Sequence, residues 1–488
     1  MPDRPEPVTA SWRGALVCAL LAGLVRLAIV LLPPADLLEN GRVWTEELLR
    51  GNVAIEILRG PIVPLQDHAV GLWGGAVVVG ILAAPLFALL GAVLPALRIA
   101  CLPFPMIEAA AAFVLLGRLG GRRAAWAAGL LVAFAPPGPV LDSVLAQGTH
   151  QHFHALTLGW MAFAAEVRAR RLGACAQAAL TCALGLLLYF GGGLLIALAV
   201  ALELGLDRAW WRSPRLAAAR VAGLLLGLVP LVLLRPPSRD APLGIYGHGP
   251  AGLAFGGGEE PLARLRELFV RDLPEAFWIR GDAGWALGAA WLATLLVLWV
   301  SALWLRRRER DPALLALVLY PPAFAAIWAM SPLVRGAEDL VFALRYVLPL
   351  LGVLALSAAL AIADLGARAP RAGAAILLGL VLASTVSLAT KLDLAAARET
   401  WRTPAARPQA IARIHLLRRG AEPQALERFL ERVRERRTPE ERTAILRDLD
   451  RAIETAARAY ERLRERGEEG ADPAPWRAAL ERVRQEPP

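Results

Sequence analysis

Residues 341–362 read "VFALRYVLPLLGVLALSAALAI", a run in which the only charged residue, Arg345, stands near the start. An α-helix of about 20 apolar residues crosses the roughly 30 Å hydrocarbon core of a bilayer. In hydrocarbon every backbone amide and carbonyl must be bonded within its own segment, and a helix meets that requirement. This run therefore predicts a membrane-spanning helix.

Working outward from it, similar apolar runs recur along the chain at Ala15–Leu32, Gly71–Leu90, Leu216–Leu234, Trp285–Leu305 and Gly373–Ala389. The whole composition agrees, because 57% of the 488 residues are hydrophobic, only 20% are charged and the mean hydropathy is +0.48. A soluble protein of this length carries more charge. We expect an all-α, polytopic transmembrane protein, and no stretch indicates nucleic-acid binding.

Arginine-rich connections predict which side each loop faces, since cytoplasmic loops of membrane proteins are enriched in Lys and Arg. These clusters lie at 117–123, 168–171, 207–215, 306–310 and 367–371. The N-terminus is then cytoplasmic, and the outward connections are 33–68, 136–152 and 235–283, with amphipathic stretches such as 266–278 lying on the membrane surface. The alternation predicts about eleven spans if the glycine-rich segment 71–91, which contains Pro85, is tilted or re-entrant.

The C-terminal segment 391–488 is polar and reads as a separate helical domain on the outer side of the membrane. Thr438 and Glu441 form the pattern of a capping box, with Pro439 in the first turn. Apolar residues then recur every three or four positions, at Leu446, Leu449, Ile453, Ala456, Tyr460 and Leu463. Nothing in this domain indicates catalysis.

The first external connection, 33–68, is rich in acids, among them Asp36, Glu46, Glu47 and Asp67. Its pattern predicts short helices along the membrane surface, with Leu48, Leu49, Val53, Ile57 and Leu58 facing lipid or neighbouring spans. The carboxylates would then face water or a cleft. A carboxylate at the apolar boundary is partly desolvated, which raises its pKa and suits it to proton abstraction.

Five of the six histidines fall in the outward connections, three of them in "QGTHQHFHA" at 147–155. Three interpretations of His150, His152 and His154 stay open: amphipathic imidazoles at the interface, a site for a phosphate-bearing substrate, or a metal site completed by Asp142 or Asp67. On a regular helix the three rings diverge too far to share one metal. A divalent cation is possible but is not required by the sequence.

The segment "ALRYVLPLLGVLALSAALA" (343–361) resembles a late helix of membrane glycosyltransferases of the GT-C fold. The front of the chain resembles them in layout: one span, a long acidic external loop, then "GLWGGAVVVGILAAPLFALLG" (71–91), "LRIACLPF" (97–104) and "LLGRLGGRRAAWAAGLLVAFAP" (115–136). The branch that it resembles most contains protein O-mannosyltransferases and aminoarabinose transferases. The order of the segments over residues 12–390, rather than any one motif, supports the resemblance.

The resemblance implies transfer of a sugar from a polyprenyl-phosphate carrier, with inversion, to a lipid, glycan or protein acceptor outside the bacterial cytoplasmic membrane. It implies an acidic base in the first external loop, which falls on Glu46 or Glu47 with Asp36 as runner-up. Asp67 and His68 would lie near the donor phosphate, and Arg345 and Tyr346 would contact it. In the second loop Asp142 is the only acid, and His150 and His152 stand where relatives often carry a carboxylate.

Two other classes of function remain open. A transporter would place charges inside the spans, and Arg26, Arg98 and Glu108 lie in or near apolar runs. No internal repeat supports that reading, however. A non-catalytic envelope assembly protein would use the C-terminal domain as its binding module.

Overall fold

The computed structural model describes residues 11–34, 45–68, 74–146, 151–191, 194–206, 213–233, 261–275, 282–330, 340–406, 411–412, 415–416, 423–465 and 474–485. Its described part is helical, with one isolated β-bridge between Val93 and Pro404. The all-α class is therefore confirmed. Within the residues just given, seven helical stretches are long and apolar enough to cross a membrane, and three shorter apolar helices accompany them.

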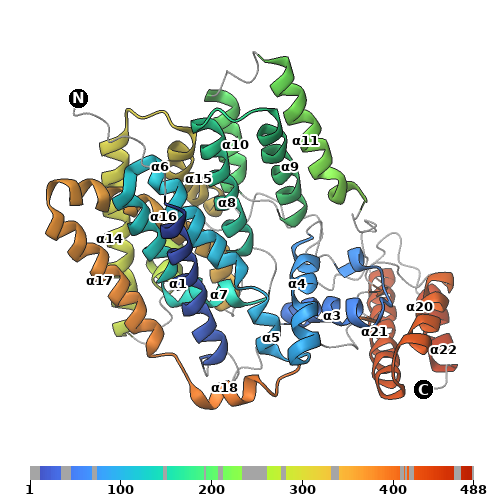
Figure 1. Ribbon diagram of the computed structural model, residues 1–488. Helices are drawn as coiled ribbons and strands as arrows, with labels where there is room; N and C mark the ends of the chain where they lie inside the picture. Colours follow the sequence, from blue (N-terminus) through green and yellow to red (C-terminus); the bar gives the residue numbers. More distant parts are fainter. Residues whose placement is uncertain are drawn as a thin grey trace.

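The seven stretches are Trp12–Leu31 in α1, Leu94–Ala133 in α5 and α6, Pro214–Leu233 in α11, Trp285–Arg306 in α14, Pro312–Ala329 in α15, Val347–Arg368 in α16 and Pro370–Ala389 in α17. The shorter apolar helices are α4 (Gly75–Leu90), α9 (Ala174–Phe190) and α10 (Leu194–Leu206). Helix α8 (Gln151–Ala169) packs between α6 and α9, and α16 (Leu340–Arg368) lies at the centre of the bundle (Figure 1). The expected total of about eleven crossings stays a prediction.

Helix α6 (Pro103–Ala133) turns back on itself at Gly121, where φ is 76° and ψ is −172°. That conformation is essentially restricted to glycine. The ring of Phe113, before the turn, meets the ring of Trp126, after it, with centroids 5.2 Å apart. The predicted arginine-rich connection at 117–123 is thus a tight hairpin between two antiparallel helices.

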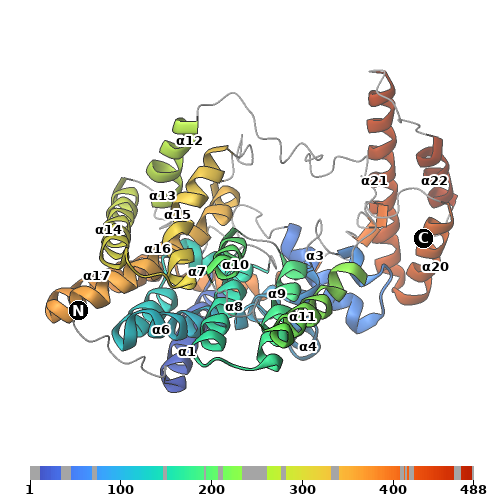
Figure 2. The same cartoon turned by 90° about the horizontal axis from the view of Figure 1, so that it is seen from above.

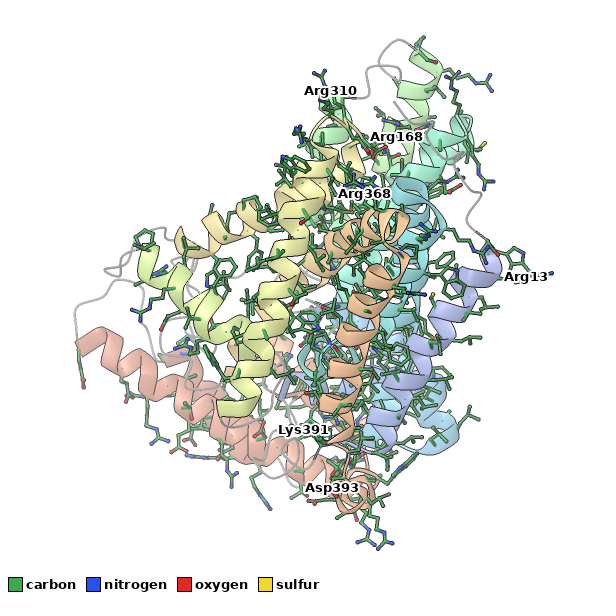
Figure 3. The ribbon with its side chains drawn as sticks, turned by 90° about the vertical axis from the view of Figure 1, so that its left-hand side faces the viewer. Arg13, Arg168, Arg310, Arg368, Lys391 and Asp393 are labelled. Atoms are coloured by element: carbon green, nitrogen blue, oxygen red, sulfur yellow. The ribbon has the colours of Figure 1, made fainter. Side chains whose placement is uncertain are left out.

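The arginine-rich connections meet at one end of the bundle, which we call the arginine-rich end. Arg306 binds Asp364 through two nitrogens, at 3.1 and 2.9 Å, and donates to the carbonyl of Leu119 at 2.7 Å. Arg118 and Arg170 both pair with Glu166. Figure 3 shows Arg13, Arg168, Arg310 and Arg368 toward this end, and Lys391 and Asp393 at the opposite end.

At the opposite end lie α3 (Thr45–Arg59), the 3₁₀ turn η1 (Leu65–His68), α5 (Leu94–Ile99), α7 (Pro137–Val144) and α18 (Leu394–Thr400) (Figure 1). Both ends of α4 bond to this end of the bundle: the amide of Gly74 donates to the carbonyl of Tyr189 at 2.7 Å, and Ala405 donates to Ala92 at 2.9 Å. Both ends of α4 are thus held at the same end of the bundle, and the expectation that 71–91 is tilted, re-entrant or half inserted stays a prediction.

The C-terminal helices α20 (Pro423–Arg436), α21 (Pro439–Glu465) and α22 (Ala474–Gln485) project to one side of the bundle (Figure 2). The capping box is present: Glu441 N donates to Thr438 Oγ1 at 3.3 Å, and Thr438 N donates to Glu441 Oε2 at 3.2 Å. Leu426, Phe429, Val433, Leu449 and Ile453 form the interior of this domain together with Ile62 and Val63 of the first connection. Its core therefore includes part of the membrane domain.

A short helical segment, α12 (Pro261–Glu267), η4 (Leu268–Asp272) and α13 (Leu273–Glu275), precedes α14 (Asp282–Arg306). It corresponds to the amphipathic stretch expected near 266–278. Trp285 donates to the carbonyl of Val270 at 2.7 Å, and a Cβ at Gly288 would come within 2.1 Å of the carbonyl oxygen of Pro274. The segment is therefore packed directly on the start of the following span.

Candidate functional site

Helix α3 brings the acids of the first connection into the protein. Glu47 is completely buried, and Arg98 of α5 donates to its two carboxylate oxygens, from Nε at 3.2 Å and from Nη2 at 3.0 Å. The backbone amide of Ala146, from the second connection, donates to Oε1 at 3.0 Å. One carboxylate therefore ties the first external connection to the second.

The expectation that the carboxylates of α3 face water or a cleft is wrong for Glu47 and Glu56, which are 0% exposed. Its apolar side chains were expected to face lipid or the neighbouring spans, and Leu48 and Val53 are buried while Ile57 and Leu58 are 38% and 47% exposed. The physical reason is that each carboxylate has an arginine from a distant part of the chain, Arg98 or Arg437, and a buried charge is tolerable when it is paired and hydrogen-bonded.

The second connection forms the next wall of the site. Nε2 of His152 lies 3.0 Å from the carbonyl oxygen of Ser143, and its ring lies 4.5 Å from the ring of Phe104. Asp142, one residue earlier on α7, is 6% exposed. The structure thus places Asp142 and His152 beside the segment that Glu47 holds.

The Asp67–His68 pair lies in η1, with side chains that are 2% and 4% exposed. The segment just before it is fixed by Glu56, whose Oε2 accepts hydrogen bonds from the amides of Ile62 and Val63. The other oxygen of Glu56 pairs with Arg437 of the C-terminal domain. Burial raises the pKa of Glu56, although Arg437 and the two amides act in the opposite direction.

A polar network inside the bundle adds residues that the sequence did not assign to the site. Gln151 donates to both oxygens of Glu108, at 3.0 and 3.1 Å, and His154 Nε2 lies 3.6 Å from Glu108 Oε1. Arg26 donates to Ser143 Oγ at 3.3 Å and to the carbonyls of Val132 and Ala133. The signal that could have found this network is a charge inside an apolar run, as at Arg26 and Glu108.

Several candidates fall outside what the structure describes. Asp36 and His150 lie in stretches that are not among the described residues. Glu46 belongs to α3, and Arg345 and Tyr346 belong to α16, but their side chains are not described. Their proposed roles therefore stay predictions.

Metal binding was one interpretation of the histidine cluster. Among the residues that the structure describes, no three His, Cys, Asp or Glu side chains lie together in a way that could hold a metal ion. His152 and His154 face different partners, the Ser143 carbonyl and Glu108. Asp36, Glu46 and His150 are the candidates that this finding does not cover.

Comparisons with known proteins give a fold likeness only. No family model matches the sequence, and no curated protein matches it. Among solved structures, the chain is similar to ArnT from Cupriavidus metallidurans bound to undecaprenyl phosphate, with 15% identity and a TM-score of 0.51 over 96% of this chain and 74% of that one. It is also similar to the Archaeoglobus fulgidus oligosaccharyltransferase in the apo form, with 13% identity and a TM-score of 0.50, covering 89% of this chain and 59% of that one. Both are GT-C glycosyltransferases, and the chain has the GT-C membrane fold.

Proposed function

We propose that this protein is a membrane glycosyltransferase that moves a sugar from a polyprenyl-phosphate carrier to an acceptor. The fold supports the proposal, since a solved structure of the same fold is an ArnT bound to undecaprenyl phosphate. The observation that carries it is the hydrogen bond from Ala146 to Glu47, which joins the first and second connections at one end of the bundle. Asp67, in η1, belongs to the first of these connections, and Asp142 and His152 belong to the second.

Glu47 is a positioning residue in this proposal. Its oxygens already accept three hydrogen bonds from Arg98 and Ala146, which hold the first and second connections together. The acid that accepts the acceptor's proton is then Asp36, Glu46 or Asp67. Glu47 therefore has a positioning role in place of the catalytic role that was expected of it, while Asp36, Glu46 and Asp67 keep the catalytic role.

The proposed reaction is a direct displacement at the anomeric carbon. The acceptor oxygen forms a bond to that carbon, the bond to the phosphate oxygen breaks, and the hydroxyl proton passes to the carboxylate. The departing polyprenyl phosphate keeps the electron pair and carries additional negative charge. Arg345, Tyr346 and His68 would stabilise that charge, because preorganised cations and donors act where charge develops.

The site end of the bundle would face outward. The arginine-rich end gathers Arg118, Arg168, Arg306 and Arg368, and an excess of arginine marks the cytoplasmic side. In a bacterial cytoplasmic membrane the site and the C-terminal domain would then face the periplasm. Polyprenyl-phosphate sugars on that leaflet could reach α3 and η1.

The test uses purified full-length protein in lipid nanodiscs with a panel of polyprenyl-phosphate sugars, and follows donor loss and product formation by mass spectrometry. We expect turnover of at least one donor, and roughly a hundredfold or greater loss in whichever of Asp36→Asn, Glu46→Gln and Asp67→Asn removes the base. Glu440→Gln, at an exposed position of α21, is the matched control. Full activity in all three acid variants would refute the assignment. A parallel reaction with chelator shows whether a divalent cation takes part.

A transporter remains the second candidate because Glu108 is 2% exposed inside the bundle, beside Gln151 and His154. Intramembrane carboxylates of this kind mark ion pathways in transporters. Reconstituted protein that moves protons or solute, with loss of flux in Glu108→Gln and no donor turnover in any condition, would favour this reading over sugar transfer.

A further inference from the structure

A cavity of about 400 Å³ opens at the arginine-rich end, far from the candidate site. It lies between the start of α1 and the α6 hairpin, and we call it the α1–α6 cavity. Its lining residues are Ser11, Arg13, Gly14, Val17, Phe113, Gly117, Arg122, Ala125 and Trp126. The cavity is therefore lined both by the guanidinium groups of Arg13 and Arg122 and by the aromatic rings of Phe113 and Trp126.

The two arginines differ from many others at this end in having no acidic partner among the residues that the structure describes. Arg118 and Arg170 pair with Glu166, Arg168 lies 3.9 Å from Asp311, and Arg306 pairs with Asp364. Arg13 and Arg122 form no ion pair with any residue that the structure describes; Arg13 only stacks over the ring of Trp12, at 5.7 Å. The cavity thus carries positive charge that the described part of the protein does not neutralise.

The cavity also continues into the apolar surface of α1. Val17 lines it and is 43% exposed, and the neighbouring Leu16 and Leu20 are 47% and 48% exposed. On a helix that crosses a membrane these side chains face acyl chains. The cavity therefore joins a cationic rim to a hydrocarbon-facing surface, which is the distribution of polarity in a phospholipid.

We propose that the α1–α6 cavity binds an anionic phospholipid, with its headgroup phosphate between Arg13 and Arg122 and its glycerol and upper acyl carbons against Val17, Phe113 and Trp126. Guanidinium groups bind phosphate through two parallel hydrogen bonds. Basic pockets between transmembrane helices are a recognised setting for anionic headgroups. The bound lipid would brace the α1–α6 contact and is independent of the sugar-transfer proposal.

The test is native mass spectrometry of the full chain, delipidated and then titrated with phosphatidylglycerol or phosphatidylcholine. We expect a retained phosphatidylglycerol and a weaker phosphatidylcholine adduct. Arg13→Gln/Arg122→Gln should weaken phosphatidylglycerol retention by roughly tenfold to thirtyfold, since each arginine near an anionic lipid contributes about 1 kcal/mol. The control is Arg308→Gln/Arg371→Gln, which removes two exposed arginines that do not line the cavity.

Unchanged unfolding temperatures without lipid would show that both double variants fold, and the single variants Arg13→Gln and Arg122→Gln repeat the titration if the double variant is unstable. Equal weakening by the two double variants would mean general surface attraction and overturn the proposal. Retention of phosphatidylcholine as strong as that of phosphatidylglycerol would overturn it as well.

Discussion

Glu47 and Arg98 illustrate how single residues determine the geometry of the site. The pair joins α3 to α5, and both side chains are almost completely buried, at 0% and 1% exposure. Removing one partner of such a pair leaves an uncompensated charge in a low-dielectric interior, which is more costly than the net worth of the pair itself.

We therefore expect Arg98→Met to destabilise the protein by about 3–5 kcal/mol. The measurement is the unfolding transition in detergent, followed by tryptophan fluorescence. The matched control is Arg59→Ala, because Arg59 is 51% exposed in its pair with Glu441 and an exposed pair contributes about 0–1 kcal/mol. Equal losses of unfolding free energy in the two variants would show that the buried Glu47–Arg98 pair stabilises the protein no more than an exposed pair does.

The Glu56–Arg437 pair leads to a prediction about pH. Burial raises the pKa of Glu56, so its protonated form is favoured by the fold, and the stability that Glu56 contributes is present at low pH and lost as pH rises through the raised value. Arg437 lowers the pKa of Glu56, so removing Arg437 should raise that pKa further and favour the protonated carboxyl. Arg437→Met should therefore be strongly destabilised at pH 8 and should partly recover near pH 5.

The measurement for this pair is hydrogen–deuterium exchange of residues 61–68 and 423–436 at the two pH values. In Glu56→Gln/Arg437→Met the pH-dependent recovery should be absent, because no carboxyl remains to take up a proton. Recovery of the same size in the double variant would show that another group titrates.

For individual residues, the sequence could indicate which side chains are candidates for the site but not which side chains they bind. Asp67, His68, Asp142 and His152 were expected in the outward connections; the structure places them in η1, α7 and the start of α8, and their roles stay predictions. Arg98 and Arg437 could not be matched to Glu47 and Glu56, because the partners are 51 and 381 residues apart and no local spacing rule reaches that far. A charged residue inside an apolar run, such as Arg98, indicated only that an oppositely charged or hydrogen-bonding partner is needed.

At the level of elements, the hairpin in α6 depends on one residue. Gly121 has a positive φ and an extended ψ, and a Cβ there would meet no atom within 4 Å. Glycine is therefore required at this position because of its backbone conformation and not because neighbouring atoms leave no space. The carbonyl of Leu119 accepts a hydrogen bond from Arg306, which holds the turn against α14.

Gly121→Ala should cost about 1–3 kcal/mol, the range for strained backbone at a non-glycine residue. Gly379→Ala is the control, since Gly379 lies inside α17, has no positive φ and has open space around its Cβ. There alanine should be neutral or stabilising by up to about 1 kcal/mol. Thermal unfolding of both variants checks this, and a Gly121→Ala variant as stable as Gly379→Ala would show that the turn does not require glycine.

Apolar periodicity predicted the long helices well because hydrophobic length is a property of the segment alone. The short helix α3 was harder: its apolar positions suggested a surface-lying helix, yet α4 and the stretch at Ala405 cover it. A Cβ at Gly51 would lie 1.7 Å from the carbonyl oxygen of Ala405, which shows how closely the two segments approach. Such contacts between distant segments have no local sequence signature.

At the scale of the whole molecule, the protein has two chemically different ends. One end gathers the arginine-rich connections, and the other gathers α3, η1, α7 and the C-terminal domain (Figures 1 and 3). The division into a membrane domain and a C-terminal helical domain stays a prediction. Arg437 and Arg436 bind Glu56 and the carbonyl of Pro61, so the C-terminal helices are anchored just before Asp67 and His68.

The most direct measurement of the central claim, that the end of the bundle carrying the first connection and α18 lies across the membrane from the arginine-rich end, is compartment-specific cysteine labelling. Single cysteines replace Arg59, Arg398 or Arg308 in a chain whose native cysteines are changed to alanine, and a membrane-impermeant maleimide is added to intact spheroplasts. We predict labelling at 59 and 398 and, until the membrane is permeabilised, none at 308. Labelling of 59 and 308 from the same side would contradict the account.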